Sequence, residues 1–232
     1  YSGCPAEEYL QNLRGYQRAK EFDKMRRSDT QVIMCLSAVK NPIMSASWEV
    51  DAGEDTPEAK VQAEFIQHVL FNDMDQPWSR FVSEALSFID FGHSVFEITN
   101  KVVLDHPKFG SYNGIRSLGW RSPKTILTFN LDEETGKLAS ISQWSNGDLS
   151  RSVDIPSQFL LVLNSRKEGS NYEGISWLRP CYGSYIRKAT CLKLNAIGIE
   201  KFAVPTPLVK VPTGKEGTVD FESMIAALEV YT

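Results

Sequence analysis

The chain has few of the residues that build catalytic or metal sites. Its three histidines, His68, His93 and His106, stand far apart, and none has a second ligand at the spacing of a metal site. The segment 174–176 lacks the second glycine of a G-x-S-x-G motif, and the Gly-Lys pair at 214–215 lacks the upstream glycines of a P-loop. The sequence therefore predicts no catalytic residue, no bound metal and no cofactor.

Paired cysteines and long apolar runs are also missing. Cys4, Cys35, Cys181 and Cys191 form no C-x-x-C pair. We interpret Cys35 and Cys181, which fall on expected helices, as reduced and partly buried thiols of an intracellular chain. The best apolar run, residues 159–163, is far shorter than a membrane-spanning helix, and no signal peptide is recognisable. We expect no membrane partner.

An excess of positive charge is absent as well. The chain has 25 Lys and Arg residues against 29 Asp and Glu residues, which gives a net charge of −4. Proteins that grip duplex DNA usually carry a basic surplus that neutralises phosphates. Any contact with nucleic acid should therefore be loose or local.

One long helix stands out among the features that are present. Ser176 is a plausible N-cap, Pro180 fits the first turn, and Pro205 ends the segment. Its apolar positions recur every three or four residues: Leu178, Cys181, Tyr182, Tyr185, Ala189, Leu192, Ala196 and Ile199. A helix of this length spans roughly 35 Å, which favours a strut over a core helix.

The rest of the chain predicts helices followed by strands. Residues 5–27 predict a charged surface helix or arm, and Ser28 caps a second helix that ends at Asn41-Pro42. Residues 43–50 predict a strand anchored by Trp48. Further helices begin at Pro57 and Pro77, and further strands cover 94–98, 115–121, 125–129, 138–144 and 159–163, the last of them central. The fold class is α+β with a mostly antiparallel sheet.

A core and several charged residues can be assigned from the same pattern. The residues expected to be buried together are Trp48, Phe65, Phe81, Leu86, Phe96, Ile98, Leu127 and Leu161. Glu97 should form an ion pair with Arg116 or Arg121. The carboxylates at 132–134 fit a solvated turn better than a cation site, and His93 fits a structural turn.

Several short motifs occur in one order. They are MRRSDTQ at 25–31, KNPI at 40–43, WEV at 48–50, FGHSVFEI at 91–98, IP at 155–156, NYEGISWLRPCY at 171–182 with Lys188, and EKFAVP at 200–205. In this order they resemble the portal proteins of tailed bacteriophages, especially the Mu-like branch, over about residues 25–207. The resemblance implies a wing at 1–173, a stem helix at 174–204 and the start of a clip at 205–232, in a longer polypeptide.

The resemblance also implies a structural role without catalysis. Portals form a ring, usually of twelve subunits, at one capsid vertex of the virion, after assembly in the host cytoplasm. The ring is a channel for genome packaging and ejection, so its partners are double-stranded DNA, the major capsid protein, the terminase and a head–tail adaptor. Candidates for the DNA channel or the subunit interface are Arg187, Lys188, Lys193 and Lys201.

Three other functions are compatible with parts of the sequence. The chain could be another phage neck or baseplate structural protein, which would share its acidic, cofactor-free composition. It could be a small hydrolase that uses Asp105 and His106. A host intracellular binding module would also fit the mixture of helices and strands, but it would leave the ordered motifs to coincidence.

Overall fold

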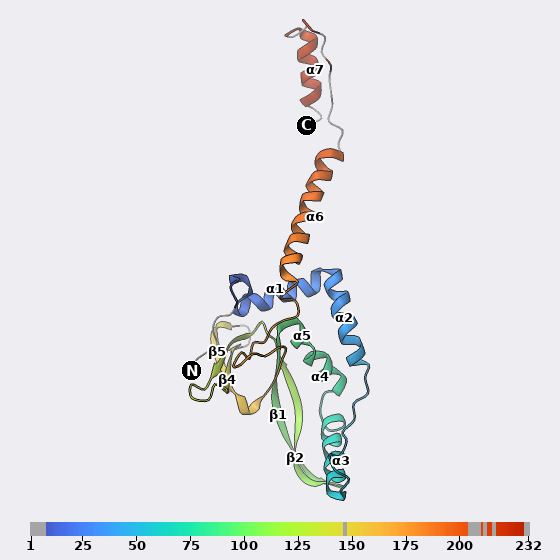
Figure 1. Cartoon of the computed structure of the whole chain (residues 1–232), viewed down its shortest axis with the longest axis vertical. Coiled ribbons are helices and arrows are strands. Elements are labelled where there is room, and N and C mark those ends of the chain that lie inside the picture. Colours follow the sequence, from blue (N-terminus) through green and yellow to red (C-terminus); the bar gives the residue numbers. More distant parts are fainter. Residues whose placement is uncertain (1–7, 146–147, 204–209, 211–212, 215–216, 230–232) are drawn as a thin grey trace. The chain divides into compact units, whose positions relative to one another are not determined.

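The structure is a computed structural model that describes residues 8–145, 148–203, 210, 213–214 and 217–229. The chain forms two units, one ending at Tyr182 and one beginning at Gly183. The first unit combines helices and antiparallel strands, so the predicted α+β class is confirmed (Figure 1). Among the described residues, no helix is both long and apolar enough to cross a membrane.

Side-chain caps set the starts of two helices in the first unit. Its helices are α1 (Gly15–Ser28), α2 (Thr30–Met44), α3 (Pro57–Phe71), α4 (Trp78–Ala85) and α5 (Ser87–Phe91), with 3-10 turns at Gln11–Leu13 and Ser157–Phe159. The Asp29 carboxylate accepts the N–H of Gln31 at 2.9 Å, at the start of α2. The Thr56 hydroxyl accepts the N–H of Ala59 at 3.2 Å, at the start of α3. Each cap satisfies a backbone donor that has no partner inside its helix.

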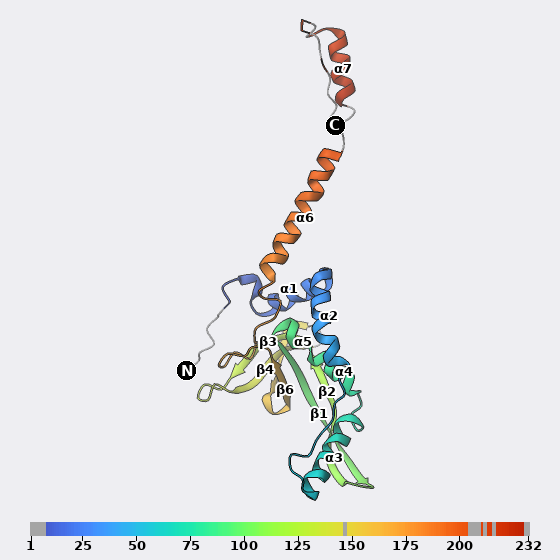
Figure 2. The same ribbon diagram turned by 45° about the vertical axis from the view of Figure 1, so that its right-hand side comes forward.

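The strands form two sheets instead of the single sheet expected. One sheet has the order β2-β1-β6, from β1 (His93–His106), β2 (Gly110–Arg121) and β6 (Leu160–Asn164). The other has the order β3-β4-β5, from β3 (Ile126–Leu131), β4 (Leu138–Ser145) and β5 (Asp148–Pro156). All pairs are antiparallel, and both sheets are visible in Figure 2.

Two apolar clusters hold these layers together. On one face of the β2-β1-β6 sheet, Phe96 and Leu118 pack with Phe81 and other residues of α4 and α5. On the other face, Val95 packs against Ile126 and Ile141 of the second sheet, with partly buried residues around them. Because β1 supplies both Val95 and Phe96, this strand is the middle layer of the unit.

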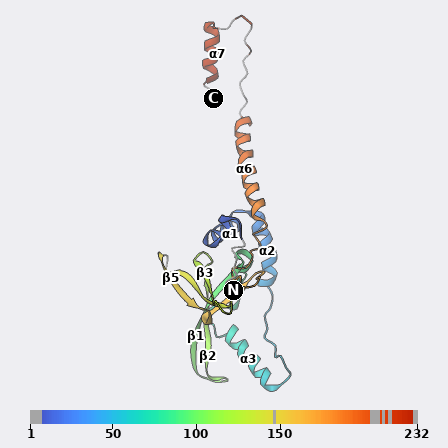
Figure 3. The same cartoon turned by 60° about the vertical axis from the view of Figure 1, so that its left-hand side comes forward.

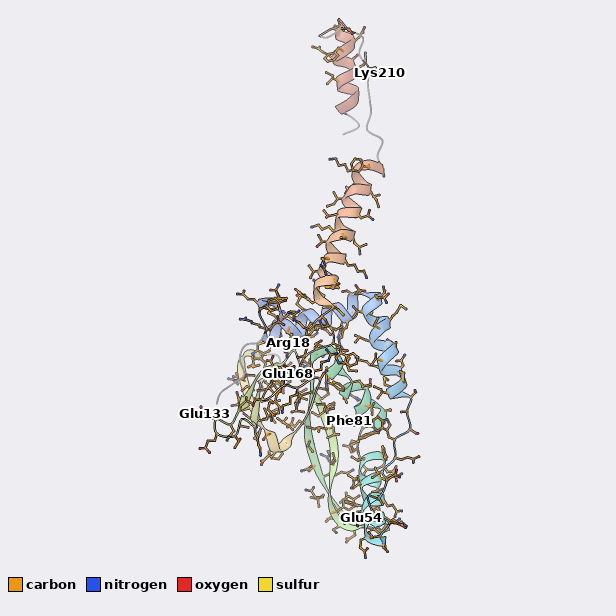
Figure 4. All side chains as sticks on the ribbon, in the orientation of Figure 1. Arg18, Glu54, Phe81, Glu133, Glu168 and Lys210 are labelled. Atoms are coloured by element: carbon orange, nitrogen blue, oxygen red, sulfur yellow. The ribbon has the colours of Figure 1, made fainter. Side chains whose placement is uncertain are left out.

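The unit is drawn out at one end. The far half of the β1–β2 hairpin extends beside α3, where the ring of Phe65 meets the ring of Tyr112 at 5.0 Å and 90° (Figures 1 and 2). In Figure 4, Glu54, just before α3, lies at the opposite end of the unit from Arg18 of α1. Figure 3 shows α2 on the outside of the unit, on the side away from β5.

The prediction of a surface helix at 5–27 is wrong in part. The helix begins at Gly15 and its inner side is covered, since Ala19, Phe22 and Met25 are buried. These three positions are spaced by three residues, which is a helical apolar stripe, although charged residues surround it. Sparse apolar positions were therefore enough to bury one face of α1.

The predicted strand at 43–50 does not form. Helix α2 continues through Pro42 to Met44, past the Asn41-Pro42 stop that the sequence suggested. Trp48 is half exposed, and its ring makes an edge contact with the ring of Trp78, at 6.0 Å between centroids. An extended segment becomes a strand only where a neighbour completes its hydrogen bonds, and no neighbour is paired with this one.

The expected core is confirmed only in part. Phe81, Leu86 and Phe96 are buried in one cluster, with Ile98 and Leu161 packed against it. Phe65 instead packs on the hairpin, and in β3 it is Ile126, not Leu127, that enters the core. A shift of one residue in a strand moves a side chain to the other face.

The apolar run at 159–163, predicted as a central strand, contributes to β6, which is an edge strand of its sheet. Its Leu161 and Leu163 reach the cluster under the helices, while Leu160 and Val162 reach the cluster between the sheets. Both faces of the strand are therefore covered by other layers, and this explains its composition without a second strand neighbour.

The cysteines differ from expectation. Cys35, Cys181 and Cys191 are free thiols, but all three are exposed instead of partly buried. Cys181 also precedes the helix on which it was expected.

Truncation of Phe96 tests the layer assignment. Phe96 is fully buried, and its ring lies 5.0 Å from that of Phe81. Phe96→Ala should therefore lower the free energy of unfolding by about 3–5 kcal/mol in urea titrations. Phe159→Ala, at a 43% exposed position, is the matched control and should cost about 1 kcal/mol or less. A loss below about 1 kcal/mol for Phe96→Ala would mean that the core is elsewhere.

Candidate functional site

Helix α6 (Tyr182–Ala203) carries all four of the candidate interface cations. It has 22 residues, which corresponds to about 33 Å. The predicted start at Ser176 is wrong, because residues 177–181 form turns before the helix begins at Tyr182. Pro180 explains the delay: it disfavours helical geometry at Arg179, and it has no N–H to donate.

Helix α6 exposes apolar side chains on more than one side. Leu192 and Ile199, on the predicted stripe, are each 59% exposed in the single chain. Ile186 and Ile197 are also exposed and lie about 120° and 140° around the helix from Leu192. This second stripe was not predicted from the sequence, although its spacing of eleven residues is close to three full turns. Apolar side chains around a helix normally require cover on more than one side.

The four cations do not form one face. Arg187 and Lys201 lie about 40° apart around the helix and about 21 Å apart along it. Lys188 and Lys193 lie on either side of that line. All four are exposed, and the Arg187 guanidinium lies 3.5 Å from the Ser184 hydroxyl. The structure therefore places them along the whole of α6 without gathering them at one point.

A junction of three backbone segments precedes α6. The N–H of Ser165 donates to the Gly92 carbonyl, and the N–H of Ile175 donates to the Ser165 carbonyl, both at 2.8 Å. The N–H of Trp177 donates to the Ile89 carbonyl at 3.0 Å. We call residues 89–93, 164–165 and 173–177 the junction.

Two glycines make the close approach within the junction possible. Gly92 has φ +94° and Gly174 has φ +59°. A Cβ on Gly174 would lie 2.2 Å from the Gly92 carbonyl oxygen, and one on Gly92 would lie 2.7 Å from the Glu173 carbonyl oxygen. Both positions therefore require glycine for conformation and for space. They lie inside the quoted motifs, but nothing in the sequence alone indicated that they touch.

A buried carboxylate binds the helices to the junction. Asp90 is 1% exposed and is paired with Arg26 of α1 at 3.0 Å and with Lys40 of α2 at 2.6 Å. Its backbone carbonyl accepts the hydroxyl of Ser176, which in turn accepts the N–H of Leu178 at 3.0 Å. A buried carboxylate needs such partners to remain charged.

Ion pairs also tie the start of the chain to the segment that leads into α6. Glu8 forms a two-pronged pair with Arg179, and Arg18 lies 2.7 Å from Glu173. Burial alone raises the pKa of Glu8, but the hydrogen bonds from Arg179 and the Leu10 N–H outweigh burial, and the pKa falls. A cavity of about 610 Å³ lies between α1, β3 and residues 170–176, and these ion pairs line it.

His93 is buried in the junction in its neutral form. Its Nδ1 lies 3.0 Å from the Glu173 carbonyl oxygen, which can only accept, so Nδ1–H is the donor. Burial first and the Arg18 charge second lower the pKa of His93, the hydrogen bond to Glu173 opposes them, and the resulting pKa is about 3. The prediction that His93 is a structural turn residue is consistent with these contacts.

The other sequence candidates have structural partners. The backbone N–H groups of Lys108 and Phe109 donate to His106 Nδ1 at 3.3 and 3.2 Å, within the turn of the hairpin. Asp132 accepts the Thr135 N–H at 2.7 Å, as expected of a solvated turn. Glu97 pairs with Arg121, one of its two expected partners. Within the described ranges, no group of three or more metal-binding side chains could hold an ion.

Comparison with known families identifies the class of protein. The family model described as the portal protein of Mu bacteriophage matches residues 19–229. This chain therefore belongs to the Mu bacteriophage portal protein family. The match extends beyond the segment 25–207 on which the resemblance was based.

Comparison with individual proteins gave one result among curated sequences and one among solved structures. No curated protein matches the sequence. Among solved structures, a chain from "Neck of empty GTA particle computed with C6 symmetry" is similar over 90% of this chain and 55% of that one. The sequence identity is 10% and the TM-score is 0.45. The present chain thus spans about half the length of that neck chain.

Substitution of Gly174 tests the junction. Gly174→Ala should lower the free energy of unfolding by about 3 kcal/mol or more, because it combines a left-handed backbone with a clash against backbone atoms. Gly169→Ala is the control, since Gly169 has φ +54° with no atom near its Cβ position. It should cost only about 1 kcal/mol. Equal losses in urea titrations would show that the close approach is unimportant.

The buried histidine predicts a pH dependence of stability. Between pH 6.5 and about 3, the unfolded chain binds a proton on His93 that the folded chain excludes, so stability falls as the pH falls. The free energy of unfolding should drop by about 2–3 kcal/mol from pH 7 to pH 4.5. His93→Gln should flatten the curve in this window. A wild-type curve and a variant curve with the same slope would contradict the assignment.

The carboxylate of Asp23 accounts for a separate loss of folding stability at lower pH. Burial raises the pKa of Asp23, but hydrogen bonds from Lys124 and Arg26 outweigh it and bring the pKa to about 2. Its contribution to stability is lost only below pH 3.8, as the pH falls toward 2. The window above pH 4 therefore reports on His93 with little contribution from Asp23.

Proposed function

We propose that this chain is the wing and stem part of a portal subunit, with the wing at 1–173, the stem at 174–204 and the start of the clip at 205–232. Twelve copies form a ring at one vertex of the capsid. The ring is the channel through which the genome is packaged and ejected. Membership of the portal family supports this assignment.

The observation that carries the proposal is the pair of apolar stripes on α6. Leu192 and Ile199 on one side, and Ile186 and Ile197 on another, are exposed in the single chain. A helix in a closed ring has a neighbour on each side, so both stripes become covered at once. A monomer would leave them in water.

Two cations of α6 share the side away from Leu192 with the exposed Leu194. Arg187 and Lys201 lie away from Leu192, where a ring would face its channel or the next stem helix. Within α6 they stand with Lys188 and Lys193 against a single acid, Glu200. Exposed cations contact passing phosphates weakly at physiological salt, because screening acts over about 8 Å. Weak contacts suit a channel in which DNA must slide.

The partners and location follow from the same role. In this proposal the ring binds the major capsid protein around it, the terminase during packaging and a head–tail adaptor afterwards. It assembles in the host cytoplasm and remains in the virion. The role is structural and needs no catalytic residue, which agrees with the use of His106 and Asp132 in turns.

Two substitutions on α6 separate its two surfaces. Leu192→Asp should prevent ring formation, since it places a charge in a packed seam. Arg187→Glu should leave ring formation nearly intact and impair DNA packaging or retention. Ring formation is read from electron micrographs and sedimentation of the full-length protein, and packaging from DNA protected against nuclease.

The opposite pattern would reassign the arginine. If Arg187→Glu abolishes rings while the surviving rings package normally, Arg187 is an inter-subunit salt-bridge residue and not a channel residue. A wild-type full-length protein that forms no ring at any concentration would overturn the proposed function itself.

A further inference from the structure

The outer surface from Thr30 to Trp48 is almost free of charge. Charged residues make up 23% of the chain, yet Lys40 is the one charge in these nineteen positions. Lys40 is turned inward to the buried carboxylate of Asp90. The neighbouring α1, which is shorter by one residue, carries seven charged side chains. Solvent-facing helices in a monomer normally carry charge, so this surface is exceptional.

The residues of this surface are exposed in the single chain. None of the residues of α2 is fully buried. The exposed positions, which we call the α2 face, are Thr30, Gln31, Ile33, Met34, Cys35, Ala38, Asn41, Pro42 and Met44, and they continue through Ser45, Ala46 and Ser47 to Trp48. Met34 is 65% exposed and Trp48 is 46% exposed. In Figure 3, α2 lies along the outside of its unit.

Three of the other apolar residues of α2 lie on its inner side and pack against the core. Leu36, Val39 and Ile43 pack against the cluster formed by α4, α5 and the β2-β1-β6 sheet. They recur at intervals of three and four residues, as one stripe of a helix must. The apolar residues of the α2 face are therefore not needed for the core of their own chain.

The size of the α2 face fits a protein interface. A helix of fifteen residues is about 22 Å long, and half of its circumference presents roughly 500 Å² of accessible surface. A standard interface takes about 800 Å² from each partner. The α2 face with the segment to Trp48 approaches that area, and its lack of charge matches the centre of such an interface.

We propose that the α2 face is a contact surface for a second copy of this chain in the ring. The inference rests on the proposed function, because a ring supplies each copy with two neighbours. An apolar surface takes an apolar partner surface, and the same unit exposes apolar side chains on its hairpin, where Val102 and Leu104 are more than 70% exposed. The α2 face lies in the unit that precedes α6, so it is separate from the stripes of α6.

A charge placed in the α2 face tests the contact. Met34→Arg should raise the protein concentration for half-maximal ring assembly at least tenfold, measured by sedimentation or mass photometry of the full-length protein. Val61→Arg is the matched control, since Val61 is 57% exposed on α3, between Lys60 and Glu64. This substitution should change the protein concentration for half-maximal ring assembly less than twofold. Because Met34 is exposed, the thermal unfolding of monomeric Met34→Arg should match that of the wild type.

The thiol of Cys35 gives a second measurement within the same surface. In a chain with Cys4, Cys181 and Cys191 replaced by serine, Cys35 should react with a maleimide at least tenfold more slowly in rings than in monomers. Where the two measurements differ, the reactivity of Cys35 decides. If Cys35 reacts in rings at the monomer rate, the inference is wrong. The α2 face would then be a binding surface for another virion protein, and the proposal of a ring would not be contradicted. A wild-type chain that never leaves the monomer state would overturn both the inference and the ring.

Discussion

The backbone contact between Gly92 and Gly174 is the constraint on which the first unit depends. It fixes the end of α5 against the segment that leads to α6, and it leaves no room for any side chain at either glycine. Around it, the peptide groups of Ser165, Ile175 and Trp177 find their partners in other segments of the chain. Hydrogen bonds of this kind satisfy groups that would be costly to bury unpaired. The junction therefore holds three segments of the first unit together shortly before the chain continues into α6.

Ion pairs connect the helices to this junction. Asp90 lies next to the junction and draws in Arg26 from α1 and Lys40 from α2. The pairs Glu8–Arg179 and Arg18–Glu173 connect the start of the chain to the same region. Because buried pairs of this kind lose much when one partner is removed, the helices and the junction should lose their structure together. Asp90 thus connects α1 and α2 to the junction in addition to their apolar contacts, which are Phe22 and Met25 of α1 and Leu36, Val39 and Ile43 of α2.

Local signals in the sequence predicted what is local in the structure. The helix starting at Pro57, the glycine stop at Gly92 and the turn at Asp132 each depend on a few adjacent residues, and each is confirmed. Long-range relations were not predictable: Lys40 and Asp90 are fifty residues apart, and no pattern marks them as partners. The burial of β6 was misread because apolar residues on both faces indicate two covered faces, not two strand neighbours. On α6, the first stripe and the four cations were visible in the sequence, but the second stripe was overlooked.

Pro42, within α2, has a consequence for hydrogen bonding on the exposed side of that helix. Proline has no N–H, so the carbonyl of Ala38, four residues earlier, receives no bond from it. Ala38 is one of the exposed residues of the α2 face, so a carbonyl without this helical bond belongs to a surface that has little charge. An apolar contact by itself has little directional preference, whereas a single accepting oxygen does. A donor on a packed neighbour that bonded to the Ala38 carbonyl would restrict the rotation of that neighbour against α2.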